Sequence, residues 1–301
     1  MKLIESRAEY IPQEEGLEGI YKMIELAGRT AYHSQDKITP DSAKDFVDRM
    51  IKSKHGVALE HGTVYLICSA TDCDGDIRNL SLYHQVNNKY SDVVDKNNYL
   101  YVTTNFRVLQ ENNWLDDLQY LCPPTEFHEK RYTMRFTCSR AIAQELTRHR
   151  TFSFLMESQR YINYSKERHG GDITFIIPSW LNCPFDNITE SELCYLANQY
   201  PQEVADRRFL TSLLESEYAY MTLLQKGCTP QQARDVLPNA TKTELIMTGF
   251  ASDYRHLFDL RLFDKTGASH PDMKDLMQKA QKAMQEAGIW EAIMSRPSKF
   301  E

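Results

Sequence analysis

Residues 131–150, "RYTMRFTCSRAIAQELTRHR", change from one structural period to another without a break. In the first nine residues, apolar and polar side chains alternate, which is typical of a strand with one buried face. The residues that follow, "RAIAQELTR", indicate a helix. A chain that contains this junction combines sheet and helix, so the segment predicts a mixed fold.

Other segments contain the same two periods. "GLEGIYKMIELAGRTAYHS" has apolar residues at helical spacing, and "TPDSAKDFVDRMIKS" predicts a second helix, with Thr39 as its N-cap and Pro40 at its first position. "HGTVYLICSA" and "ITFIIPSW" predict strands, and "RYINYS" predicts an extended segment. Residues 72–130 give mixed signals.

The C-terminal third is predicted to be helical. "VADRRFLTSLLESEYAYMTLLQKG" indicates a long helix that stops at Gly227. Thr229 and Gln232 form a capping box at the start of a short helix that carries Arg234. A longer helix is predicted over residues 243–262. These elements predict an α+β class and a single domain over residues 1–301.

The composition limits the partners of the chain. Its 301 residues are 42% hydrophobic, which is enough for a proper core. The net charge of -7 argues against bulk nucleic-acid binding, for which a basic domain is expected. Residues 130–168 nevertheless hold nine Lys or Arg against three Glu. A local positive region in an acidic protein suits a small anionic ligand.

The cysteines and the N-terminus indicate a cellular compartment. The seven cysteines are odd in number and scattered, and no CxxC pair occurs, which indicates free thiols in a reducing environment. The N-terminal residues lack an apolar signal core, and no run approaches the roughly 18 apolar residues of a membrane span. We therefore expect a cytoplasmic protein that does not enter a membrane.

Several common site types are missing. The sequence has no GxGxxG, GxxxxGK[ST] or GxSxG motif. A bound nucleotide would therefore need arginine side chains for its phosphates, because the planar guanidinium matches phosphate in a bidentate way. In "HGVALEH", His55 and His61 are six residues apart, which misses the i, i+4 spacing of a helical zinc motif. We predict no metal site.

The segment "ELTRHRTFSFLMESQRYINYSKE" is the strongest candidate site. Its Arg-His-Arg triplet could simply complement the negative end of a helix dipole. However, Arg160 follows the apolar stretch "TFSFLM", and we expect the chain to fold back and bring the two cationic points together. Ser158 and Gln159 add hydrogen-bonding groups to the same tight turn. The segment therefore predicts a cradle that holds a phosphate and reads a polar ring.

The same segment resembles a known signature. Arg-His-Arg, seven residues and then Ser158 is the pattern of the flavin-dependent thymidylate synthases. "SRAIAQELTRHR", "SQRY", "HGVALEH", "AGRTAYHS", "GCTPQQARDVLP" and "FDLR" are similar to the other motifs of that family. The resemblance covers about residues 15–70 and 131–275, and residues 72–130 resemble an insertion found in longer members.

The resemblance implies a reaction and an assembly. Such enzymes convert dUMP to dTMP with 5,10-methylenetetrahydrofolate as carbon donor, reduced FAD as hydride source and NADPH as reductant of the flavin. They need no cysteine nucleophile and bind no nucleic acid. Their fold is a twisted antiparallel sheet flanked by helices, and they form homotetramers whose active sites lie between subunits.

The resemblance also implies site residues. Arg261 would be catalytic, because it stabilises the deprotonated uracil. The residues expected to bind dUMP are Glu145, Arg148, Glu157, Ser158, Gln159, Arg160, Arg234 and Arg261. Those expected to bind FAD are Arg148, His149, Arg150, Glu157, Ser252 and His256. In this interpretation Arg160 contacts the phosphate, and Arg234 meets dUMP from the start of its capped helix.

The chain departs from the commoner family pattern at several positions, among them Val57, where a Thr is common. Glu145 stands where many members have Gln, so it must pair with a cation or point at the base. Met156 replaces a polar residue, and Glu157 would supply the acid one position later. Phe250 and Ser252 stand where many members use Asn and Arg for FAD. Two alternatives therefore stay open: a degenerate member that binds flavin with another activity or none, and a nucleotide- or RNA-binding protein.

Overall fold

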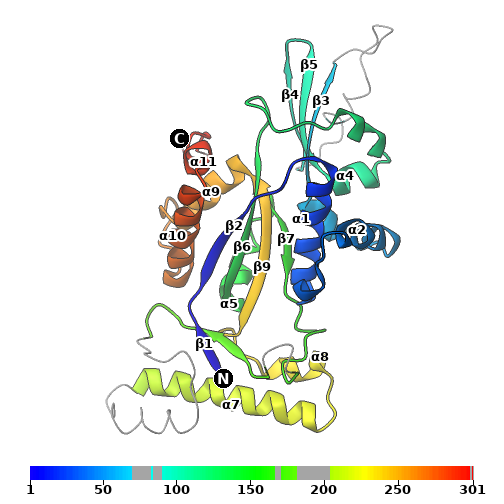
Figure 1. Cartoon of the computed structure of the whole chain (residues 1–301). Coiled ribbons are helices and arrows are strands. Elements are labelled where there is room, and N and C mark those ends of the chain that lie inside the picture. Colours follow the sequence, from blue (N-terminus) through cyan, green and yellow to red (C-terminus); the bar gives the residue numbers. More distant parts are fainter. Residues whose placement is uncertain (70–82, 84–89, 167–170, 182–203, 299, 301) are drawn as a thin grey trace.

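The computed structural model describes residues 1–69, 83, 90–166, 171–181, 204–298 and 300. Antiparallel sheets and helices alternate through these residues, which confirms the α+β class (Figure 1). Among the described residues, no helix combines the length and the apolar character of a membrane span.

The central sheet contains four antiparallel strands. β2 (Arg7–Ile11), β6 (Arg131–Ser139), β9 (Lys242–Phe250) and β7 (Ser153–Met156) follow one another in the order β2-β6-β9-β7. β6 and β9 pair over all nine residues of each strand. These two long strands lie side by side through the middle of the molecule in Figure 1.

The two faces of this sheet carry different layers. Side chains alternate along β9, so Leu245 and Met247 point to one face and Glu244 and Thr248 to the other. The first face packs against α5 (Arg140–Leu146), α9 (Ala251–Arg261), α10 (Pro271–Glu286) and α11 (Trp290–Met294). The second face meets α1 (Gly16–Ala31) and the 3-10 turn η2 (Gly56–His61).

A smaller sheet extends the second layer. β3 (Thr63–Ser69), β5 (Tyr99–Asn105) and β4 (Asp92–Lys96) pair in the order β3-β5-β4. Their apolar residues share a core with α1, with α2 (Ser42–Lys52) and with α4 (Phe106–Glu111). Two 3-10 turns, η1 (Gln35–Lys37) and η3 (Leu115–Tyr120), complete this part of the chain.

A third core lies at the far end of the central sheet. β1 (Lys2–Ile4) pairs in parallel with β8 (Thr174–Ile176). The long helix α7 (Val204–Gln225) and the short α8 (Pro230–Ala233), followed by η5 (Arg234–Val236), pack beneath this pair (Figure 1). The predicted helix stop is confirmed, since Gly227 adopts a left-handed φ of 91°. The predicted capping box of Thr229 and Gln232 is confirmed as well.

The predicted helix over residues 243–262 is wrong in its first half. Residues 242–250 form strand β9, and the helix begins only at Ala251. β9 lies between β6 and β7, and its Leu245, Ile246 and Met247 are fully buried. Pairing on both edges and burial on both faces therefore outweigh the helical propensity of these residues.

Two other local predictions are also wrong. The helix predicted to start at Pro40 starts at Ser42, with Asp41 as N-cap, and the Ser42 hydroxyl bonds back to the Thr39 backbone. "RYINYS" is not extended, because the Tyr161 and Ile162 amides both donate to the Ser158 carbonyl in a turn. That turn buries the Ile162 side chain.

We expect Gly249→Ala to lower the free energy of unfolding by about 1–3 kcal/mol. A Cβ at Gly249 would lie 2.3 Å from Cδ1 of Phe152. Phe152 is buried and packs edge-on against Tyr254, with ring centroids 4.8 Å apart, so it has no room to yield. Denaturant unfolding would measure the loss. Adding Phe152→Leu should recover part of it, and an unchanged stability in the single variant would contradict this packing.

Candidate active site

The Arg-His-Arg triplet follows the last turn of α5. The N-cap of this helix is Ser139, whose side chain accepts a hydrogen bond from the Ile142 amide at 3.3 Å. After the helix ends, Arg148 and Arg150 are exposed, whereas His149 turns inward and is half-buried. The triplet therefore presents two guanidinium groups to solvent on either side of an imidazole that contacts the protein.

His149 contacts the predicted catalytic arginine. Nε of Arg261, in the last turn of α9, donates to Nε2 of His149 at 3.2 Å. Nη1 of Arg261 lies 3.5 Å from Oε2 of Glu145. Burial, together with the nearby Arg261 and His256, lowers the pKa of His149 to about 4. The imidazole is therefore neutral near pH 7, as an acceptor of the Arg261 hydrogen bond has to be.

The Glu145 carboxylate thus pairs with a cation, which is one of the two arrangements expected for it. Arg261 is held between a carboxylate and a neutral imidazole, with a quarter of its side chain exposed. The fold brings these three residues together from two segments that are distant in the sequence. We call Glu145, His149 and Arg261 the arginine cluster.

Two other residues predicted to bind FAD, Ser252 and His256, lie on α9. The His256 ring stacks on Phe300, with centroids 5.5 Å apart and an interplanar angle of 22°. The Ser252 amide, at the opposite end of the helix from Arg261, donates to Glu129 at 3.0 Å. Phe250 is buried, and its ring lies 5.6 Å from the guanidinium carbon of Arg131. The first turn of α9 is therefore occupied by contacts within the chain.

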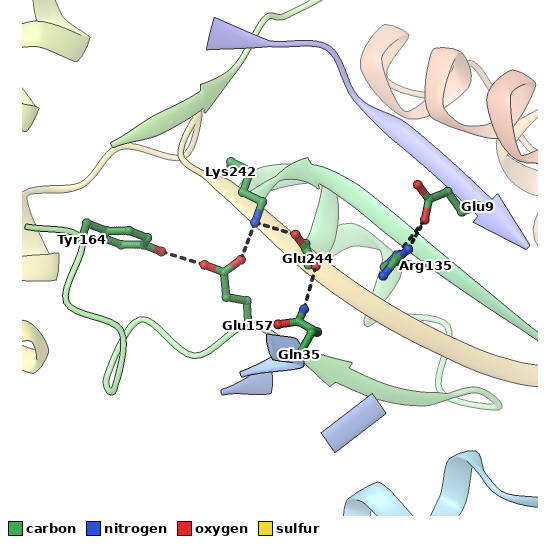
Figure 2. Close-up of polar contacts among 7 residues, drawn as sticks. All are labelled: Glu9, Gln35, Arg135, Glu157, Tyr164, Lys242 and Glu244. Atoms are coloured by element: carbon green, nitrogen blue, oxygen red, sulfur yellow. Dashed lines mark hydrogen bonds and ion pairs between the residues drawn. The ribbon is translucent and has the colours of Figure 1, made fainter. Parts of the chain in front are cut away.

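The predicted residue Glu157 lies in a second polar group, whose other members were not predicted. This side chain is only 2% exposed, and both its carboxylate oxygens are engaged. Oε1 accepts from the Tyr164 hydroxyl at 3.1 Å, and Oε2 lies 2.9 Å from Nζ of Lys242 (Figure 2). Lys242 also reaches Oε1 of Glu244 at 2.8 Å. Glu157 therefore acts as an internal anchor in this chain.

The residues after Glu157 form a compact turn. The Ser158 amide donates to the Ala31 carbonyl at 2.9 Å, and the Gln159 side chain is buried. Arg160 is exposed, and its Nε donates to Oε1 of Gln231 at 3.1 Å. We call residues 158–160 the cradle segment.

Arg234 is linked to the cradle segment through the short helix α8. It follows Gln231, the partner of Arg160, by three residues. The expectation that Arg234 lies at the start of its helix is wrong, because it is the C-cap of α8. That helix has only four residues, so the side chain is displaced from the positive N-terminal end toward η5.

The single tight turn predicted to unite these groups is wrong. Residues 153–156 form strand β7, which pairs with β9 from Ser153↔Thr248 to Met156↔Leu245. The arginine cluster packs with α5 and α9 on one face of the central sheet, whereas Lys242 and Glu244 point to the other face. β7 therefore separates the Arg-His-Arg triplet from the cradle segment.

Sequence reasoning missed Lys242, Tyr164 and Gln231. Lys242 starts a strand that was predicted as a helix, so its position opposite Glu157 was hidden. A signal was present, because "TKTELIM" places two charged side chains two residues apart before an apolar run. In a strand, that spacing puts both charges on one face.

His61, in the motif "HGVALEH", has a structural position. Its side chain is fully buried, and Nδ1 lies 2.8 Å from the Thr248 hydroxyl, which contacts the Thr133 hydroxyl at 2.8 Å. His61 thus ties η2 to the central sheet. His55, at the start of η2, is exposed.

Three cavities lie elsewhere on the described chain. Their volumes are about 700, 270 and 330 Å³, and no residue predicted to bind dUMP or FAD lines any of them. Within the described ranges, no group of three or more His, Cys, Asp or Glu side chains could hold a metal ion. None of these three cavities therefore coincides with the predicted site residues.

Comparisons with known proteins point to one family. The family model described as "Thymidylate synthase complementing protein" matches residues 110–287. A flavin-dependent thymidylate synthase of Corynebacterium efficiens is 35% identical over 129 residues, which is 41% of this chain and 46% of that protein. One from Pyrococcus furiosus is 29% identical over 128 residues, covering 42% and 44% of the two chains. The match thus spans about half the length of these curated relatives.

A viral relative and a solved structure were found as well. A probable flavin-dependent thymidylate synthase of Paramecium bursaria Chlorella virus 1 is 28% identical over 141 residues, covering 47% of this chain and 61% of the viral protein. The crystal structure of a UMP/dUMP methylase PolB from Streptomyces cacaoi, bound with 5-Br dUMP, is 18% identical, with a TM-score of 0.42. That alignment covers 96% of this chain and 92% of the other.

Proposed function

Because this chain belongs to the thymidylate synthase complementing protein family, whose model matches more than half of it, we propose that it is a flavin-dependent thymidylate synthase. It would be a methyltransferase that converts dUMP to dTMP with 5,10-methylenetetrahydrofolate as carbon donor. The observation that carries the proposal is the arginine cluster, in which Arg261 lies between Glu145 and the neutral ring of His149.

The geometry of this cluster suits an electrostatic role. Its anchors restrict the direction of the Arg261 guanidinium, while part of the group stays accessible. A positioned cation stabilises negative charge that develops on a bound ring without reorganising during the reaction. We assign to Arg261 the stabilisation of the deprotonated uracil.

The cradle segment would hold the rest of the nucleotide. Exposed Arg160 suits the phosphate of dUMP. Arg234, three residues after the Gln231 that accepts from Arg160, would supply a second cation. The Ser158 hydroxyl and the Gln159 amide would contribute hydrogen bonds. Because both oxygens of Glu157 are used within the chain, we assign Glu157 to support this segment rather than to contact a ligand.

The Arg-His-Arg triplet fits an anionic cofactor. Arg148 and Arg150 are exposed at the end of α5, and guanidinium groups match the geometry of phosphate oxygens. We propose that they hold FAD together with His149, and that His256 and Ser252 extend the contact along α9. When bound, FAD supplies the hydride and is reduced by NADPH.

A homotetramer would complete the site. The triplet and the cradle segment are separated by β7, and the groups that anchor them lie on opposite faces of the central sheet, so one chain alone does not join them into one site. A second copy could supply the missing side. We also propose that residues 1–301 form one catalytic domain with an insertion at 72–130, and that the protein is cytoplasmic and binds no nucleic acid.

The proposal is tested by dTMP formation from dUMP, methylenetetrahydrofolate and NADPH, with and without added FAD. We expect product only when FAD is present. Folded protein that binds FAD but forms no dTMP would contradict the proposal and favour a degenerate flavoprotein. Tight RNA binding that falls steeply with salt would instead favour a nucleic-acid-binding protein.

A further inference from the structure

We infer that Lys242 is a positioning residue for the nucleotide, because its ammonium group joins Glu157 to Glu244 and so fixes the cradle segment. The inference rests on the proposed function of that segment. Lys242 lies in the first position of β9, outside every motif of the family resemblance.

The contacts of Lys242 are short and largely buried. Nζ lies 2.9 Å from Glu157 and 2.8 Å from Glu244, and the Lys242 side chain is 14% exposed. Glu157 is also bound through its backbone, since its amide donates to the Glu244 carbonyl at 2.8 Å. The two glutamates are thus joined twice, by this backbone bond and by one ammonium group. Figure 2 shows the bridge through the ammonium group.

The charges show why the ammonium is needed. Burial alone would lower the pKa of Lys242, but Glu157 and Glu244 outweigh this effect and raise it. Burial would likewise raise the pKa of Glu244, and Lys242 reverses the shift and lowers it. Without Lys242, two carboxylates that meet at one point in a poorly hydrated place would repel each other.

Displacement of the Glu157 side chain would move the residues proposed to bind the nucleotide. Ser158 is the next residue, and Arg160 follows two residues later. On the other side, Tyr164 donates to Glu157 from the end of the same turn, so Glu157 closes a loop of the chain around the cradle segment. Moving its carboxylate would therefore shift both ends of the segment that carries Arg160.

Three variants separate position from charge. Lys242→Met should raise the Kd for dUMP by about tenfold or more and raise KM more than it lowers kcat, with FAD affinity unchanged. Lys242→Arg should restore dUMP binding to within about threefold, because it keeps a cation between the glutamates. Lys242→Met with Glu244→Gln restores the net charge of the group without the bridge, and we expect dUMP binding to stay weak.

The measurements are calorimetry with dUMP, steady-state kinetics and thermal unfolding. Lys44→Met is the matched control, because this exposed lysine forms a similar ion pair with Asp48 at 2.8 Å. If Lys242→Met fails to fold, Lys242→Arg and the double variant carry the test. Wild-type affinity in Lys242→Met, or full recovery in the double variant, would overturn the positioning role.

The outcomes also distinguish this inference from the proposed function. Turnover by the wild type together with unchanged dUMP binding in Lys242→Met would refute the inference alone. A wild type that binds dUMP but makes no dTMP would refute the proposed activity, and the affinity series would still decide the role of Lys242. A wild type that does not bind dUMP would refute both.

Discussion

Replacing Arg261 with alanine should lower kcat for dTMP formation by about a hundred- to a thousandfold, the usual effect of removing one positioned group that stabilises transition-state charge. Arg261 is held by His149 at 3.2 Å and Glu145 at 3.5 Å, so its cation is fixed before any ligand arrives. FAD should remain bound, because Arg148 and Arg150 are unchanged. Steady-state kinetics and flavin absorbance would measure the two effects separately.

Two further variants make this test specific. Arg261→Lys keeps the charge but has a single nitrogen in place of the fork, so we expect an intermediate kcat. Lys282→Ala, on the exposed side of α10, is the surface control and should not change kcat. Full activity in Arg261→Ala would refute the catalytic role of this residue, whereas loss of flavin would move Arg261 to the cofactor site.

Acidification from pH 7 to pH 5 should lower the free energy of unfolding, and His61 alone should account for about 2 kcal/mol of the loss. Burial and the nearby Arg131 lower the pKa of His61 from 6.5 to about 3. In the unfolded chain the imidazole binds a proton as the pH falls below its ordinary pKa, whereas the folded protein does not. Stability therefore declines from about pH 6.5 down to the folded pKa.

Denaturant unfolding of wild type and His61→Asn at both pH values would isolate this effect. The variant should be less stable at pH 7, because it loses the contact with Thr248. Its additional loss at pH 5 should be about 2 kcal/mol smaller than that of wild type. His55→Asn is the control, because this histidine is exposed. Equal pH dependence in His61→Asn and wild type would contradict the prediction.

Much of the local structure could be predicted from the sequence. The strand at residues 131–139 and its junction with α5 follow from alternation and then helical spacing, and both are confirmed. The stop of α7 at a left-handed glycine is a local rule and is confirmed as well. β9 could not be predicted, because its partners β6 and β7 lie far away in sequence and decide its conformation.

The sequence predicted which residues form part of the candidate site, but not how they are arranged. The sequence motifs indicated Glu145, His149 and Arg261, and the structure brings them together. The anchoring of Glu157 was not visible, because it depends on Lys242 and on the Tyr164 hydroxyl beyond the turn. Such contacts depend on the register of β9, and register is a property of the folded sheet.

β7 fixes the distance between the two residue groups on either side of it in the sequence. Its four residues are locked to β9 and span roughly 10 Å, at about 3.3 Å per residue, between the Arg-His-Arg triplet and the cradle segment. Adding or removing one residue here would exchange the two faces of the strand, turning Leu155 away from α1 and Phe154 away from α9. Because β7 is paired with β9, the seven residues between Arg150 and Ser158 fix the distance between the triplet and the cradle segment.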